Sequence, residues 1–195
     1  LLPVQSFSQN NPNEALWTEN GWSLKKVVSN TSIPSGVNFS YTIIFSAPAG
    51  TTSISIQDLV PSSLQVVSVT SAGAVCSVTP VTNVTGNLVT YNLTGLSPSC
   101  APMGSFTIVV KFPEGKTCNG ETARNKAEIM VNGKWESTPF VSTSATAAAV
   151  APRSCRRTRR GNRARHATRR SDRASLRSGG FVERAAVDHG AQHAA

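Results

Sequence analysis

Short segments that alternate apolar and polar residues are the feature that most limits the fold of this chain. The alternation is clearest in residues 105–112, where Phe106, Ile108 and Val110 share one face. The alternating segments are, in chain order, 22–28, 37–45, 54–60, 64–70, 87–93, 105–112, 123–131 and 135–142. A period of two puts alternate side chains on opposite faces of a strand, and no segment shows a convincing helical period.

Turn-forming residues separate these segments and define how the strands connect. Pro and Gly recur at roughly 8–12-residue intervals, and Asn132-Gly133 is the strongest signal for a two-residue hairpin. Many short strands with regular turns are typical of a β-sandwich. The sequence therefore predicts an all-β fold, an antiparallel immunoglobulin-like β-sandwich of about 7–8 strands over residues 21–145.

The two ends of the chain differ from this central region. Residues 1–20 are polar and Asn-rich apart from Trp17, and they are predicted to be a leader or linker. Residues 146–195 are predicted to be a linker followed by a disordered Arg-rich tail. The net charge of +9 belongs to residues 153–195, which hold twelve Arg and three acids. Residues 1–152 hold seven basic and seven acidic residues, so the predicted domain is neutral.

The Arg-rich tail has three interpretations. It can bind phosphates without sequence preference, or it can anchor the chain to acidic cell-surface polymers. It can also be a translated artefact, because an out-of-frame or cloning-derived end would explain why residues 153–195 contain no Lys. The change from Lys in the domain to Arg in the tail favours the artefact. Nucleic acid is thus expected as a partner only through the tail.

Several functions are excluded or disfavoured by composition. All three His lie beyond residue 152, so the domain has no His-based catalytic triad or His metal site, and no cofactor is expected. No apolar run approaches the roughly 18 residues of a membrane helix. The cysteine spacings match no metal motif; if a disulfide forms, Cys76–Cys100 is favoured because it would bracket the hairpin between them.

Three polar residues occupy positions where the alternation predicts core-facing side chains. Lys26 lies between Leu24 and Val28, Asp58 follows two Ile at the same spacing, and Asn125 lies between two Ala. A charged group on an apolar face is costly unless it is paired or neutralised. The three exceptions fall on three different strands that could be neighbours, so one explanation for all of them is preferred.

An intramolecular isopeptide bond uses these three residue types. A buried, neutral lysine amine can attack the asparagine carboxamide, and a carboxyl kept protonated by burial can polarise the carbonyl and transfer protons as ammonia leaves. Lys26, Asp58 and Asn125 would take these roles. The alternative is an ordinary hydrogen-bonded polar cluster, in which Asp58 caps a turn and Lys26 extends to the sheet rim.

The order of these motifs resembles that of the immunoglobulin-like conserved repeat of bacterial surface proteins and adhesins. The resemblance covers about residues 21–145 and rests on Trp22–Val28, Val37–Ile43, Asp58–Leu64, Phe106–Lys111 and Asn125–Ile129. It implies membership of the pilin and adhesin class, in which many domains carry a Lys–Asp–Asn isopeptide set. Here Lys25 beside Lys26 leaves the choice of lysine open, although the alternation favours Lys26.

The sequence therefore predicts a non-enzymatic, extracellular or cell-surface module. It would be a stalk, spacer or filament-forming subunit of a surface adhesin or pilus-like assembly, with neighbouring domains or subunits as partners. A module that binds carbohydrate or a host protein through its loops is the main alternative. Polyanion or nucleic-acid association through the tail is the other.

Overall fold

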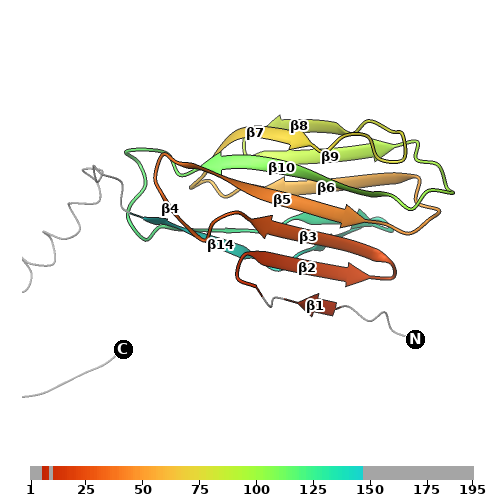
Figure 1. Ribbon diagram of the computed structural model, residues 1–195, viewed down its shortest axis with the longest axis horizontal. Coiled ribbons are helices and arrows are strands. Elements are labelled where there is room, and N and C mark those ends of the chain that lie inside the picture. The colour runs from red at the N-terminus through yellow and green to blue at the C-terminus, as the bar shows by residue number, and fades with distance from the viewer. Residues whose placement is uncertain (1–5, 9–10, 147–195) are drawn as a thin grey trace, which may run out of the picture. The chain divides into compact units, whose positions relative to one another are not determined.

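The chain is a β-sandwich of fourteen strands, without a helix in the described residues. A computed structural model describes residues 6–8 and 11–146 (Figure 1). The predicted linker and tail lie outside the described residues from position 147 onward. The all-β, antiparallel sandwich class is confirmed. The predicted count of 7–8 strands was too low.

Two large sheets form the layers, and a small sheet completes the structure. The six-stranded sheet has the order β1 (Ser6–Ser8), β2 (Glu14–Glu19), β3 (Trp22–Val28), β5 (Asn38–Ser46), β10 (Met103–Lys111) and β7 (Gln65–Ser71). The five-stranded sheet has the order β13 (Lys134–Ser137), β12 (Glu128–Val131), β6 (Ser53–Leu59), β9 (Leu88–Thr94) and β8 (Val81–Thr85). The small sheet has the order β11 (Thr122–Asn125), β14 (Val141–Thr146) and β4 (Ser32–Pro34).

The additional strands come from segments whose sequence lacks a long alternation. The segment predicted as leader contributes β1 and β2. The fully exposed strand β8 lies between the alternating segments 64–70 and 87–93 of the sequence. Residues 123–131 form β11 and β12 in different sheets, because the chain bends at the sandwich edge to change layer. The β4–β14 pair is parallel, whereas the other strand pairs among the described residues are antiparallel.

The position of β2 changes the N-terminal boundary of the domain. β2 pairs with β3 over its whole length, and Ala15 and Trp17 are fully buried. The leader predicted for residues 1–20 therefore contains a strand of the sandwich from Glu14 onward. Burial of the large Trp17 side chain stabilises this strand. Two inward-facing residues, Ala15 and Trp17, are too few for the sequence to predict it.

The core lies between the large sheets and is built on alternate residues of each strand. Tyr91 of one sheet stacks on Phe106 of the other, with ring centroids 4.7 Å apart. The predicted Asn132-Gly133 hairpin joins β12 to β13, and both residues adopt positive φ angles of 52° and 80°. Within the described residues, no helix is long and apolar enough to traverse a bilayer.

Candidate functional site: a buried lysine, aspartate and asparagine

Lys26 is fully buried in the middle of β3. Its neighbours on the same face, Leu24 and Val28, are core residues, so the alternation of the strand forces the lysine side chain inward. In the sheet, Lys26 is flanked by Ala15 of β2 and Ile43 of β5. The adjacent Lys25 points the other way and pairs at the surface with Glu14 at 2.8 Å.

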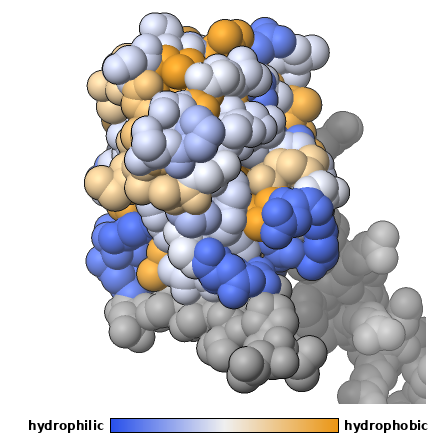
Figure 2. All heavy atoms as spheres, turned by 90° about the vertical axis from the view of Figure 1, so that its right-hand side faces the viewer, coloured by the Kyte–Doolittle hydropathy of each residue, from blue (hydrophilic) through white to orange (hydrophobic). Residues whose placement is uncertain are grey.

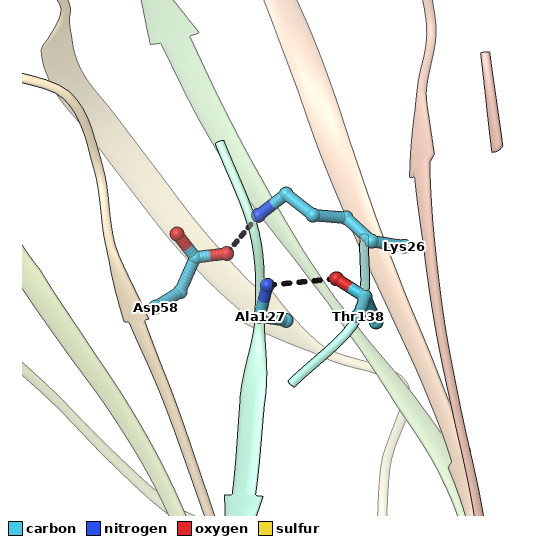
Figure 3. A network of polar contacts seen from close by, with 4 residues as sticks. All are labelled: Lys26, Asp58, Ala127 and Thr138. Atoms are coloured by element: carbon cyan, nitrogen blue, oxygen red, sulfur yellow. Dashed lines mark hydrogen bonds and ion pairs between the residues drawn. The ribbon is translucent and has the colours of Figure 1, made fainter. Parts of the chain in front are cut away.

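Asp58 faces Lys26 from the opposite layer of the sandwich. It follows the buried Ile54 and Ile56 on the inner face of β6 and is itself fully buried. Lys26 Nζ contacts Asp58 Oδ2 directly across the core, as Figure 3 shows. The second carboxylate oxygen, Oδ1, has no hydrogen-bond partner. The pair is thus both desolvated and incompletely satisfied, a costly arrangement for two charges.

Burial dominates the electrostatics of the lysine. Desolvation lowers the pKa of Lys26 from its ordinary value near 10.5, and the opposing attraction of Asp58 does not cancel this effect. The ring of Tyr41 lies beneath the amine, with 4.5 Å between Nζ and the ring centroid. Burial also raises the pKa of Tyr41, which keeps the phenol neutral beside the pair. These surroundings favour the neutral form of the Lys26 amine.

Asn125 ends β11 with its side chain inside the sandwich. Only 1% of the residue is exposed, and neither its Oδ1 nor its Nδ2 has a hydrogen-bond partner. A buried carboxamide without partners costs several kcal/mol, roughly 1–3 for each unsatisfied group. It therefore makes no hydrogen bond to Lys26 or Asp58, yet it retains the donor and acceptor capacity that a reaction partner would use.

The strand after Asn125, β12, pairs with β6, which carries Asp58. Ile129 lies opposite Ile56 and Glu128 opposite Gln57, so continuing the register sets Ala127 against Asp58. Asn125 lies two residues before Ala127, at the end of β11 in the small sheet, and its side chain is buried.

Thr138 holds the chain in place at Ala127, where it passes from β11 to β12. Its hydroxyl accepts the Ala127 N–H at 3.1 Å, and its own N–H donates to the Ala127 carbonyl at 2.9 Å (Figure 3).

Tyr41 and Thr138 were not predicted as part of the site. Tyr41 alternates with other core residues, and only the pairing of β3 with β5 reveals that it lies diagonally from Lys26. Thr138 follows a surface hairpin in sequence. To predict that Tyr41 and Thr138 lie at the site, one would need the register of the paired strands, which a single sequence does not specify.

Cys76 and Cys100 are joined by a disulfide, with their Cα atoms 6.1 Å apart. The bond links the segment after β7 to the loop after β9, and it brackets the β8–β9 hairpin. No described cysteine is a free thiol. In the described part of the chain, no three His, Cys, Asp or Glu side chains gather into a group that could hold a metal ion.

Comparison with known proteins gives matches of fold. Neither a protein-family model nor a curated protein matches the sequence. Among solved structures, BcpA, the major pilin subunit of Bacillus cereus, matches with a TM-score of 0.55 and 14% identity over 75% of this chain. A variant of the same pilin matches with a TM-score of 0.54 and 13% identity over 75% of this chain. The N-terminal domain of a Streptococcus gordonii adhesin gives a TM-score of 0.49 and 18% identity, covering 70% of this chain and 33% of the adhesin chain.

The chain spans about half of either pilin chain, 48% in both cases. At these identities the matches show a shared fold. The resemblance to pilin domains is thus confirmed at the level of the fold.

Proposed function

We propose that this chain is a structural module of a cell-surface adhesin or pilus-like assembly, stabilised by an isopeptide bond between Lys26 and Asn125. The module would act as a stalk, spacer or filament-forming subunit outside the cell, with neighbouring domains or subunits as its partners. The pilin-like fold supports the structural role. The observation that carries the bond is the fully buried Lys26–Asp58 contact, in a domain that also holds Asn125 as a buried carboxamide with no hydrogen-bond partner.

The geometry supports a balanced sequence of proton and bond transfers. Lys26 gives a proton to Asp58 through their direct contact, which leaves a neutral amine with a free electron pair. The amine attacks Cγ of Asn125, while the protonated Asp58 donates to the carboxamide oxygen and lowers the barrier. The carboxylate then takes the second amine proton and passes it to the departing nitrogen. As ammonia leaves and the C=O bond re-forms, the hydroxyl proton of the intermediate returns to Asp58. One C–N bond forms, one breaks, and ammonia leaves.

The bond would remove the unfavourable features of the site. It converts a buried amine and an unpartnered amide into one neutral secondary amide, and Asp58 is left to accept its N–H. It also ties β3 of one large sheet to β11 of the small sheet. A covalent tie between strands far apart in sequence restricts the unfolded chain, as a disulfide does. That property suits a module that transmits load.

Intact-mass measurement of the full chain tests the bond. We expect the wild-type mass to be lower than the sequence mass by one ammonia, beyond the hydrogens lost in disulfides. Asn125→Ala and Asp58→Asn should each show the full mass of their sequences. Lys25→Ala is the matched control, because this neighbouring lysine lies at the surface, and it should still lose ammonia. A wild-type protein of full mass would refute the bond.

The pH dependence of stability provides a second test. In Asn125→Ala the amine of Lys26 stays free, and its folded-state pKa lies below the unfolded value near 10.5. At pH values between the folded-state pKa and 10.5, the unfolded chain binds more protons than the folded chain. The free energy of unfolding should therefore rise with pH toward about 10, and it should fall as the pH drops through the folded-state pKa. The bonded wild type has no such amine and should lack this rise. Urea unfolding at a series of pH values measures it, and equal slopes in both proteins would contradict the proposal.

A further inference from the structure

One side of the described sandwich is built from strands that contain no charged residue. The sequence contains no Asp, Glu, Lys, Arg or His between Asp58 and Lys111, a stretch that supplies β7, β8 and β9. β7 and β8 are the outer strands of the two large sheets and lie together along the top of Figure 1. In Figure 2, strongly hydrophilic residues concentrate in the lower part, and the upper part is mostly pale or orange.

Uncharged outer strands are unusual because they invite pairing with another chain. Soluble proteins protect such edges with charged residues, Pro or bulges. In the five-stranded sheet, the outer strand opposite β8 is β13, and it carries the charged residues Lys134 and Glu136. β8 consists of Val, Thr and Asn only, and all five residues are exposed. The β8 edge is therefore open to a second strand.

The backbone of β8 has free hydrogen-bonding groups on its outer side. β8 pairs only with β9 among the described strands, through a two-residue turn at Gly86 and Asn87. The pair flanking such a turn, Thr85 and Leu88, is hydrogen-bonded. In an antiparallel pair the backbone groups of alternate residues point toward and away from the partner strand. Thr82 and Val84 therefore direct their N–H and C=O groups away from β9. An extended strand is the ligand that satisfies this pattern.

The edge is held in place at both ends. At the turn, the Asn87 side-chain amide donates to the carbonyls of Val60 and Pro61 at 3.2 and 3.1 Å, and the Val60 N–H donates to the Asn87 carbonyl at 2.9 Å. At the other end, the Cys76–Cys100 disulfide ties the segment before β8 to the loop after β9. A strand that is already ordered loses little entropy when it pairs.

We infer that β8 pairs antiparallel with β8 of a second copy of this chain. The outward-facing residues are symmetric about Asn83, so a two-fold axis there sets Thr82 of each copy against Val84 of the other in hydrogen-bonded pairs. The same register brings the two Asn83 side chains face to face. It also covers Val84, which is 43% exposed although it lies on the core side of the sheet opposite the buried Val89.

A second copy fits this edge better than an unrelated strand. The register that pairs all outward groups is self-complementary, as a two-fold interface requires. The described domain carries equal numbers of acidic and basic residues, so its charges do not oppose association. β7, the neighbouring edge of the other sheet, also lacks charge, and a second copy therefore meets no unpaired charge along either edge. This inference is independent of the isopeptide bond.

Cysteine cross-linking in the full chain tests the register. In Asn83→Cys, the two-fold axis brings the new thiols to a Cβ–Cβ distance of about 4.5–5.5 Å, close to disulfide geometry. Mild oxidation should give a covalent dimer, with the cross-link located by peptide mapping at position 83. Val81→Cys is the matched control. It is also exposed, at 67%, but lies opposite Thr85 of the second copy and about 14 Å from its own counterpart.

Sedimentation over a range of concentrations tests the association itself. The wild type should show a reversible dimer, and Asn83→Lys should raise the dimer Kd at least about tenfold, because two ammonium groups would face each other across the axis. Trp135→Lys adds the same charge to the outer strand β13 and should leave the Kd unchanged. Unchanged thermal unfolding would show that both variants fold. A wild type that stays monomeric throughout, or equal cross-linking at positions 81 and 83, would overturn the inference.

Discussion

Replacing Lys26 with Ala is expected to lower the free energy of unfolding by at least about 3–5 kcal/mol. The substitution leaves Asp58 buried with no counter-charge, since its only described hydrogen bond is to this lysine. It also opens a cavity in the core and removes the amine of the proposed bond. Urea or thermal unfolding of the full chain measures the loss.

A second substitution separates the charge effect from the cavity. Lys26→Met fills most of the space, so its loss of stability reports on the unpaired carboxylate and on the missing bond rather than on a cavity. Adding Asp58→Asn should then recover the part of that loss that comes from the charge, because the remaining buried group is neutral. If the single and the double variant are equally unstable, the ionic pair is not what the site depends on.

Replacing Trp17 with Ala should cost about 3–5 kcal/mol, the usual loss for a buried Trp. The side chain is fully buried although it belongs to a polar N-terminal segment, and removing residues 1–20 should be more damaging still. Met103→Ala is the control, because Met103 is 72% exposed and its truncation should change stability little. Denaturant midpoints give the comparison, and a stable chain without residues 1–20 would mean that β2 is dispensable.

The alternation of the sequence predicted the fold class and the inward side chains of the site. Lys26, Asp58 and Asn125 are buried as their parity indicated, because a half-buried strand imposes a strict period of two. The contact between Lys26 and Asp58 could not be predicted, since it depends on which strands face each other across the core. The parity that favoured Lys26 over Lys25 needed no such information, and the structure places Lys25 at the surface.

The strands that the sequence did not predict share a physical cause. β8 has no buried face, so its residues show no alternation. β14 does alternate, but its inward residues are the small or polar Val141, Thr143 and Ala145, which resemble a linker. In β2, two buried residues within a polar stretch are too few to define a period. Each of these strands is stabilised by tertiary pairing that the local sequence does not encode.

The last described strand determines when this domain can fold during synthesis. β14 inserts between β11 and β4, and Thr143 donates a hydrogen bond to the Asn30 carbonyl, 113 residues earlier in the chain. A chain that emerges N-terminus first holds β4 without its partner until nearly the whole domain has left the ribosome or an export channel. The domain should therefore complete its fold only after β14 has emerged, and the residues of the proposed bond would be held together only then.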